Sequence, residues 1–142
     1  MTPIQLKLSL DVQLHYLTAL RSGIKTHEGR LARPRYLALK PGDHIKIQAD
    51  PNSTTKPSAT SADNNSQAQH SQDENSGIFK VQQVTKHKTF KDMLEAHGVK
   101  AFLPGRDVDD IQGAVDVYRS FPGYAEGEKE MGVVAIQVEL AV

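Results

Sequence analysis

The stretch SGIKTHEGRL, residues 22–31, places a lysine, a glutamate and an arginine within ten residues. It comes after a segment with helical periodicity, and Gly23 is typical of a residue that ends a helix. The residues after this glycine read as a short strand. On an extended chain, Glu28 and Arg30 lie two residues apart and share one face, so their side chains can pair. Lys25 lies at the glycine turn, from which its long side chain can reach either face.

This trio of charges has two interpretations. On the concave side of a sheet, two cationic donors and one acceptor would suit an anionic or amide-bearing ligand, such as a nucleotide. On an exposed strand, the same residues would be a surface ion pair that contributes little to stability. Spacing alone favours the surface interpretation, because most charges in a mixed run are solvated.

Composition excludes several classes of function. The chain has 142 residues, enough for one domain, and carries 17 basic and 17 acidic side chains. It therefore lacks the basic field that attracts long duplex DNA, and a polyanion would have to bind a local patch. The absence of cysteine excludes disulfides and thiolate sites. Since no run resembles a signal peptide or a membrane span, we expect a soluble, cytoplasmic protein that binds no membrane.

Residues 50–77 form a polar segment without any Val, Ile, Leu, Met, Phe, Tyr or Trp. Such a segment buries too little apolar surface to offset the entropy of ordering it, so we predict a disordered surface loop. It separates two strand-like stretches, residues 44–48 and 78–85. The simplest interpretation is a β-hairpin with an enlarged turn, because the entropy of loop closure grows slowly with length. A linker between two domains is the alternative, but the flanks are too short to form two cores.

Hydrophobic periodicity and turn residues divide the rest of the chain. Asp11 and Thr89 are candidate helix N-caps, and Gly23 and Gly98 are candidate helix ends. The predicted strands are residues 4–10, 27–31, 44–48, 78–85 and 131–140, and the predicted helices are residues 13–22, 90–97 and 107–120. Residues 40–43 and 101–105 read as turns, and residues 121–130 read as irregular.

These elements do not alternate in the regular manner of a doubly wound sheet. We therefore predict a single α+β domain over residues 1–142, with a small curled β-barrel or sheet and a few packed helices. The last strand is rich in β-branched residues, which favours a central place in the sheet. In the first strand, one face is expected to carry Ile4, Leu6, Leu8 and Leu10. In the last helix, the side chains expected to face inward are Val108, Ile111, Val115 and Tyr118.

Aromatic residues supply a second set of candidates. Tyr118, Phe121 and Tyr124 flank a Pro-Gly turn and could offer a stacking surface to a base. Burial in the core is an equally good interpretation of Tyr118 and Phe121, because aromatic residues at helical spacing usually pack inside.

Other candidates for chemistry are weaker. Three basic residues after the charged stretch could form a phosphate-facing rim, although solvated surface is the simpler interpretation; they are Arg33, Arg35 and Lys40. The six histidines stand at positions 15, 27, 44, 70, 87 and 97, and no pair has a metal-ligand spacing on one helix, so we expect no metal. The sequence also has no phosphate-cradling glycine loop and no nucleophile elbow, and we expect no cofactor.

The stretch GIKTHEGRL resembles the G-x-K-x-x-E-x-R signature of the ASCH family, which is related to the PUA fold. Further family features occur in the same order over nearly the whole chain outside residues 50–77. They are Ser22-Gly23, Gly42-Asp43, Thr89-Phe90, Leu103-Pro104-Gly105, Tyr118-Arg119-Ser120-Phe121 and Gly132-Val133-Val134-Ala135-Ile136. Each match is weak alone, but their joint order is specific.

The resemblance implies a PUA-like β-barrel with a cleft lined by the signature. It also implies binding of RNA or of a nucleotide derivative; some members are amidohydrolases of acylated cytidine, and others have been proposed as ribonucleases. In the amidohydrolase branch a lysine matches Lys25, whereas a threonine of the proposed catalytic set stands where this sequence has Glu28. This chain therefore keeps the lysine and lacks the hydroxyl, and Thr26 shares the face of Glu28 rather than its position.

Three functional hypotheses result. The first is a binding module for RNA or a small nucleotide-like ligand that uses Lys25, Glu28, Arg30, Tyr118 and Tyr124. The second is a hydrolase in which Lys25 and Glu28 act as general acid and base and water is the nucleophile. The third is a protein-interaction domain whose functional element is the segment 50–77. We favour the first; the sequence does not identify the ligand or the oligomeric state.

Overall fold

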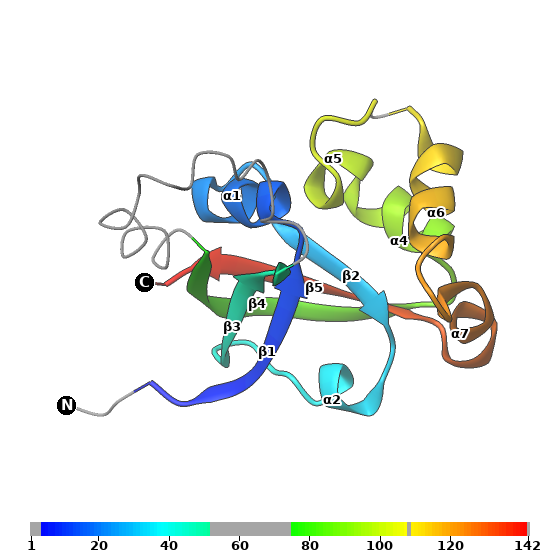
Figure 1. The fold of residues 1–142 in the computed structure, drawn as a ribbon. Helices are drawn as coiled ribbons and strands as arrows, with labels where there is room; N and C mark the ends of the chain where they lie inside the picture. Colours follow the sequence, from blue (N-terminus) through cyan, green and yellow to red (C-terminus); the bar gives the residue numbers. More distant parts are fainter. Residues whose placement is uncertain (1–3, 52–74, 108, 142) are drawn as a thin grey trace.

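The structure is a computed structural model that describes residues 4–51, 75–107 and 109–141. These residues form five strands and six helices (Figure 1). The strands are β1 (Leu6–Val12), β2 (His27–Leu31), β3 (His44–Ala49), β4 (Ser76–His87) and β5 (Val133–Leu140). The helices are α1 (Leu14–Ser22), α2 (Pro34–Leu37), α4 (Phe90–His97), α5 (Val99–Phe102), α6 (Ile111–Arg119) and α7 (Tyr124–Met131).

All five strands belong to one mixed sheet of order β1-β3-β4-β5-β2. The β1–β3 pair is parallel and the other three pairs are antiparallel. The sheet curls into a half-barrel, and its two edge strands are linked where the Arg30 guanidinium of β2 donates to the carbonyl oxygen of Asp11 in β1 over 2.8 Å. The predicted α+β fold with a curled sheet is confirmed.

Two hydrophobic cores hold this sheet. The first lies on the concave side, where α1 and α2 pack on residues such as Ile45, Ile47 and Phe79. The second lies under α4, α5 and α6, against the other face of β2 and β5. Strand β5 contributes to both cores, with Val134 and Ile136 in the first and Val133 and Ala135 in the second. Burial on both faces explains its continuous apolar sequence and its place inside the sheet.

The predicted hairpin around the polar segment is confirmed. β3 and β4 pair antiparallel, with Ile47 opposite Gly77 and Gln48 opposite Ser76. Of the loop predicted over residues 50–77, residues 52–74 lie outside the described residues. The prediction was wrong at the end of this range, because Ser76 and Gly77 belong to β4 and pair with β3. Within the described ranges, no helix combines the length and the apolar composition needed to cross a membrane.

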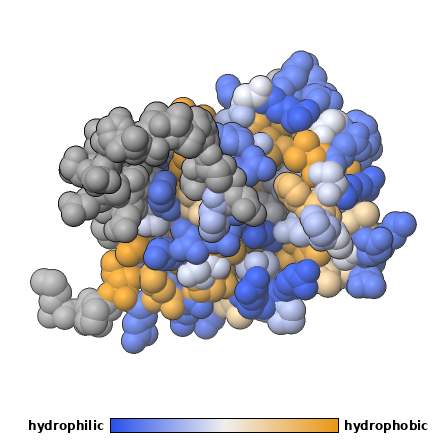
Figure 2. Space-filling view, viewed as in Figure 1, coloured by the Kyte–Doolittle hydropathy of each residue, from blue (hydrophilic) through white to orange (hydrophobic). Residues whose placement is uncertain are grey.

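Several local predictions were wrong. Asp11 does not cap α1: it lies in β1, and Gln13 is the N-cap residue. The last predicted helix begins later, at Ile111, where the side chain of Asp110 accepts a hydrogen bond from the Gly113 amide. Val108, predicted to face inward, lies outside the described residues. The apolar face predicted for the first strand is well buried only toward its C-terminal end: Leu10 keeps 2% exposure, whereas Ile4 and Leu6 keep 44% each. Figure 2 shows small hydrophobic patches on a face that is otherwise largely hydrophilic.

Three helices were not predicted. Residues 121–130, expected to be irregular, contain most of α7. Glycine is unfavourable inside a helix, but a Cβ at Gly127 would overlap the Leu31 side chain. The glycine therefore lets α7 approach β2 closely. The short helix α2 begins with Pro34 at its first position, where the missing N–H carries no cost. The predicted turn at residues 101–105 starts inside another short helix, α5.

Candidate functional site

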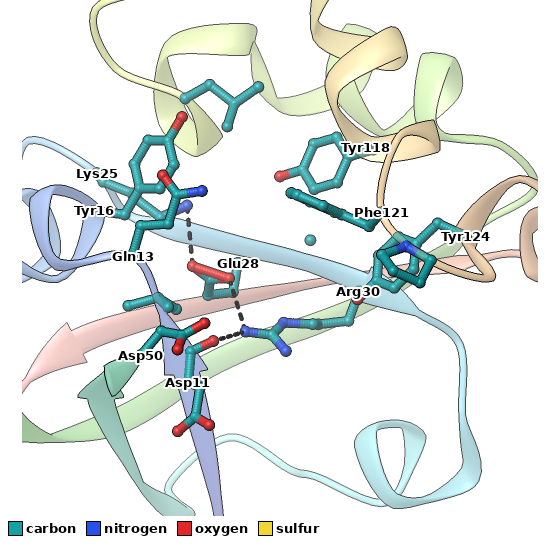
Figure 3. Close-up of a pocket in the computed structure, with 14 residues that line it drawn as sticks. Asp11, Gln13, Tyr16, Lys25, Glu28, Arg30, Asp50, Tyr118, Phe121 and Tyr124 are labelled. Atoms are coloured by element: carbon teal, nitrogen blue, oxygen red, sulfur yellow. Dashed lines mark hydrogen bonds and ion pairs between the residues drawn. The ribbon is translucent and has the colours of Figure 1, made fainter. Parts of the chain in front are cut away.

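A cavity of about 280 Å³ opens between α1 and the α6–α7 turn (Figure 3). Its floor is β2, which contributes Glu28, Gly29 and Arg30. One wall comes from the end of β1 and the start of α1, and it consists of Asp11, Val12, Gln13 and Tyr16, with Asp50 beside them. The opposite wall consists of Leu103, Tyr118, Phe121, Pro122 and Tyr124, and Lys25 lies at the inner end.

Lys25 is almost completely buried, with 2% exposure. Its Nζ donates to the carbonyl oxygens of His27 and Phe102, over 2.7 and 2.5 Å, and lies 3.2 Å from Glu28 Oε2. These three contacts occupy the three hydrogens of an ammonium group. Nζ also lies 5.3 Å from the centroid of the Tyr16 ring. Lys25 therefore fixes the position of Glu28 and presents no free hydrogen to the cavity.

Glu28 lies between two cations. Its Oε2 faces Lys25 and its Oε1 lies 3.6 Å from Arg30 Nη2. Figure 3 shows this chain of contacts running from Lys25 through Glu28 and Arg30 to the backbone of Asp11. These two contacts orient the carboxylate at the floor of the cavity.

Burial shifts the titration of the groups around this carboxylate. Burial lowers the pKa of Lys25, while the charge and hydrogen bond of Glu28 oppose that shift. Burial raises the pKa of Tyr118 well above its usual value, with a further contribution from the Glu28 carboxylate. The pKa values of Tyr16 and Tyr124 are also raised, mainly by burial. All three phenols therefore keep their protons at neutral pH and can act as hydrogen-bond donors.

The aromatic wall combines a buried part and an exposed part. Tyr118 keeps 4% exposure and stacks on Phe90 with 4.7 Å between ring centroids and 6° between ring planes. Tyr124 stacks on the same ring at 5.9 Å and is half-buried. Phe121 keeps 36% exposure and meets Tyr124 edge to face. Tyr118 is therefore a core residue that also lines the cavity, and Phe121 and Tyr124 form its accessible rim.

All five of the sequence-predicted ligand-binding residues line this cavity: Lys25, Glu28, Arg30, Tyr118 and Tyr124. Sequence reasoning missed the wall that comes from the end of β1 and the start of α1, which includes Asp11, Gln13 and Tyr16. The helical pattern assigns Tyr16 to the apolar stripe of its helix. Its second role, as part of the cavity wall beside Lys25, is visible only in the structure. The exposed Arg33 and Arg35 do not line the cavity, and Arg35 donates to its neighbour Tyr36 instead.

No set of three or more His, Cys, Asp or Glu side chains in the described ranges is arranged to hold a metal ion.

Comparison with known proteins supports the fold described above. The solved structure of hypothetical protein PH0355 is 29% identical and covers 94% of this chain and 98% of its own, with a TM-score of 0.67. The solution structure of protein PF0455 from Pyrococcus furiosus is 27% identical and covers 94% of this chain and 96% of its own, with a TM-score of 0.60. No curated protein matches the chain. The ASCH domain model matches residues 10–141. With the signature residues of β2 on the floor of a cavity in a PUA-like half-barrel, the chain belongs to the ASCH domain family.

Proposed function

We propose that the cavity binds a nucleobase-sized group, presented by RNA or by a nucleotide or modified nucleoside. The observation that supports this best is the oriented carboxylate of Glu28, buried between Lys25 and Arg30 beneath an aromatic wall. At about 280 Å³, the cavity lies just below the usual range of small-ligand sites, which is about 300–1,000 Å³, so it suits a small group such as a single base.

The lining residues match the groups on the edge and faces of a base. The Glu28 carboxylate accepts hydrogen bonds from amino or imino groups, and phenol groups donate to carbonyl oxygens. Phe121 and Tyr124 offer aromatic surface at the rim, where a base can stack. Since the formal net charge of the chain is zero, we infer a short single-stranded or free ligand rather than a long duplex.

Phosphate groups would lie outside the cavity. Asp11, Glu28 and Asp50 all line it, so its interior repels an anion more than it attracts one. Arg33 is exposed, and its charge acts on Tyr124 at the rim. An RNA backbone leaving the cavity on this side would meet Arg33 first.

Titration of the full chain with nucleosides, nucleotides and short single-stranded RNAs at low salt tests this function. Glu28→Gln should weaken base binding roughly 10- to 150-fold, the equivalent of about 1.5–3 kcal/mol for hydrogen bonds to a charged group. Glu139→Gln is the matched control, because Glu139 is exposed on β5 and accepts a hydrogen bond from Gln82, away from the cavity. Arg33→Ala should weaken RNA binding and leave nucleoside binding unchanged. Equal affinities for the wild type and Glu28→Gln would rule the site out.

A hydrolase is the second candidate function, and the lowered pKa of Lys25 beside Glu28 favours it. In this version, the Glu28 carboxylate takes a proton from a water molecule, and the water oxygen bonds to the acyl carbon or the phosphorus. The bond to the leaving nitrogen or oxygen breaks, and the Lys25–Glu28 pair, whose charged atoms lie 3.2 Å apart, returns the proton to that leaving atom. The substrate would be an acylated cytidine or an RNA phosphodiester. Turnover of either substrate above the level of a Lys25→Met variant is the expected result. Equal turnover by the wild type and by Lys25→Met would exclude the hydrolase and would not affect the proposed binding function.

A further inference from the structure

A second polar cluster lies on the other side of β2 from the cavity, between the end of β4 and the end of α4. It consists of Thr85, His87 and His97, all half-buried. The Nε2 atoms of the two histidines are 3.2 Å apart. Thr85 Oγ1 lies 3.0 Å from His87 Nε2 and 3.2 Å from His97 Nε2. Three polar atoms thus form a nearly equilateral triangle.

The separation of the two nitrogens matches shared coordination of a metal ion. Two imidazole nitrogens that each lie about 2.0–2.1 Å from a tetrahedral zinc ion are about 3.3 Å apart. At 3.2 Å the two nitrogens share at most one proton, so at least one of them is unprotonated and carries a lone pair on the side that faces the other ring. The Thr85 hydroxyl oxygen faces the same centre and can serve as a third, weaker ligand.

The surrounding packing holds the two rings in this orientation. The ring of His97 lies against His27, with centroids 4.7 Å apart, and against Phe102 at 5.9 Å. His87 meets His97 at an interplanar angle of 88°. The Nδ1 atom of His27 is occupied elsewhere, because it pairs with the Thr26 hydroxyl over 2.8 Å.

Solvent reaches this cluster from one side. His87 also lines a surface cavity of about 430 Å³, together with residues of the α7–β5 turn such as Met131 and Gly132. This cavity gives an ion a route from the surface to His87, and a metal site requires such an entry path.

We propose that His87 and His97, assisted by Thr85, bind a late first-row divalent cation, for which Zn²⁺ is the reference ion. Imidazole nitrogen favours such ions over Mg²⁺ or Ca²⁺. Water fills the remaining coordination positions, since no third His, Cys, Asp or Glu of the described ranges joins the group. No local sequence pattern indicates this site, because its two histidines stand ten positions apart on two different elements.

Calorimetric titration of the full chain with Zn²⁺ tests the proposal. The expected result is one saturable site in the wild type, which His87→Gln and His97→Gln each weaken at least about tenfold, since even loss of an outer-shell partner costs a metal site 10- to 100-fold. His15→Gln and His44→Gln are the controls, because those histidines stand on α1 and β3. Circular dichroism verifies that each variant is folded.

A second measurement needs no substitution. In ¹H–¹⁵N spectra of the imidazole rings, Zn²⁺ should shift the Nε2 signals of His87 and His97 and leave those of His15 and His44 in place. Absence of saturable binding, or affinity that is lost in the control variants and kept in His87→Gln and His97→Gln, would overturn the proposal.

Discussion

Lys25 and Glu28 form a buried ion pair at the centre of the candidate site, with side-chain exposures of 2% and 9%. Removing one partner of such a pair leaves an uncompensated charge in a region from which water is excluded. We expect Lys25→Met to lower the free energy of unfolding by about 3–5 kcal/mol. The double variant Lys25→Met/Glu28→Gln should recover part of this loss, because it removes the stranded carboxylate as well. Urea unfolding of the wild type and the variants measures both effects.

An exposed pair provides the comparison. Arg106 and Asp110 lie 3.0 Å apart, with exposures of 37% and 43%. Because water screens this pair, Arg106→Met should cost less than about 1 kcal/mol. If Lys25→Met costs no more than Arg106→Met, the buried ion pair does not hold the site together.

Gly29 lies where β2 passes beneath the aromatic wall. A Cβ at this position would lie 2.7 Å from Met93 Cε and 2.9 Å from the Tyr118 hydroxyl oxygen. The methionine end can move, but Tyr118 is buried and stacked, so Gly29→Ala should destabilise the protein by about 1–3 kcal/mol. Thermal unfolding measures this loss. Gly29→Ala/Tyr118→Phe removes the hydroxyl and should restore part of the stability; a double variant no more stable than Gly29→Ala would place the strain elsewhere.

At the scale of residues, the sequence predicted correctly that Glu28 and Arg30 share one face of their strand. Alternation along a strand is a local property, so it placed Glu28 and Arg30 on one face without knowledge of the fold. The partners of these residues could not be predicted in the same way. The carbonyl oxygens of Phe102 and Asp11 belong to distant segments, and only the closed half-barrel brings them to Lys25 and Arg30.

Among the elements, α7 determines how the aromatic wall is held. Its Glu128 keeps 5% exposure and accepts hydrogen bonds from the Phe90 amide at the start of α4 and from Arg119 Nε at the end of α6, each over 2.7 Å. One carboxylate thus joins three helices. Because α6 and α7 carry Tyr118 and Tyr124, this junction positions both phenols.

Glu128→Ala tests this role of α7. It leaves the buried Phe90 amide without its acceptor, which should cost about 1–3 kcal/mol of unfolding free energy, and it should also weaken ligand binding because the wall loosens. Thr89→Ala removes only the side-chain cap of α4, whose Thr89 hydroxyl accepts from the Asp92 amide, and should cost about 1 kcal/mol. Denaturant unfolding and ligand titration of both variants give the two readouts. Tighter or unchanged ligand binding in Glu128→Ala would show that the junction does not position the wall.

The helix α7 also shows why some elements were not predicted. Its internal glycine and its many charges argue against a helix locally, yet the contact of Gly127 with Leu31 and the two hydrogen bonds of Glu128 stabilise it through tertiary structure. By contrast, α4 has an N-cap, an apolar stripe and a terminal glycine within its own sequence, and its predicted bounds, residues 90–97, are confirmed.

For the molecule as a whole, the class of fold could be derived from composition and periodicity, but the strand order could not. β1 pairs with β3 in parallel, and β2 lies at the far edge beside β5. These pairings join residues that are distant in sequence, and no local pattern specifies them. The hairpin of β3 and β4 was predicted because its strands are interrupted only by the polar segment.

Replacing residues 52–74 with a short Gly-Ser linker tests whether the polar segment is only a connection between β3 and β4. The strand ends on either side are already fixed, since the Ala49 amide donates to the Asn75 carbonyl oxygen and the Asp50 amide donates to Val12. A shorter connection loses less closure entropy, so the free energy of unfolding should rise by about 1 kcal/mol. Affinity for nucleotides should stay within about twofold of the wild type, because Asp50 and the other lining residues are retained. Intact nucleotide binding together with loss of a protein partner would instead show that the segment serves in protein interaction. A lower free energy of unfolding would show that the segment packs against the domain, which its sequence does not suggest.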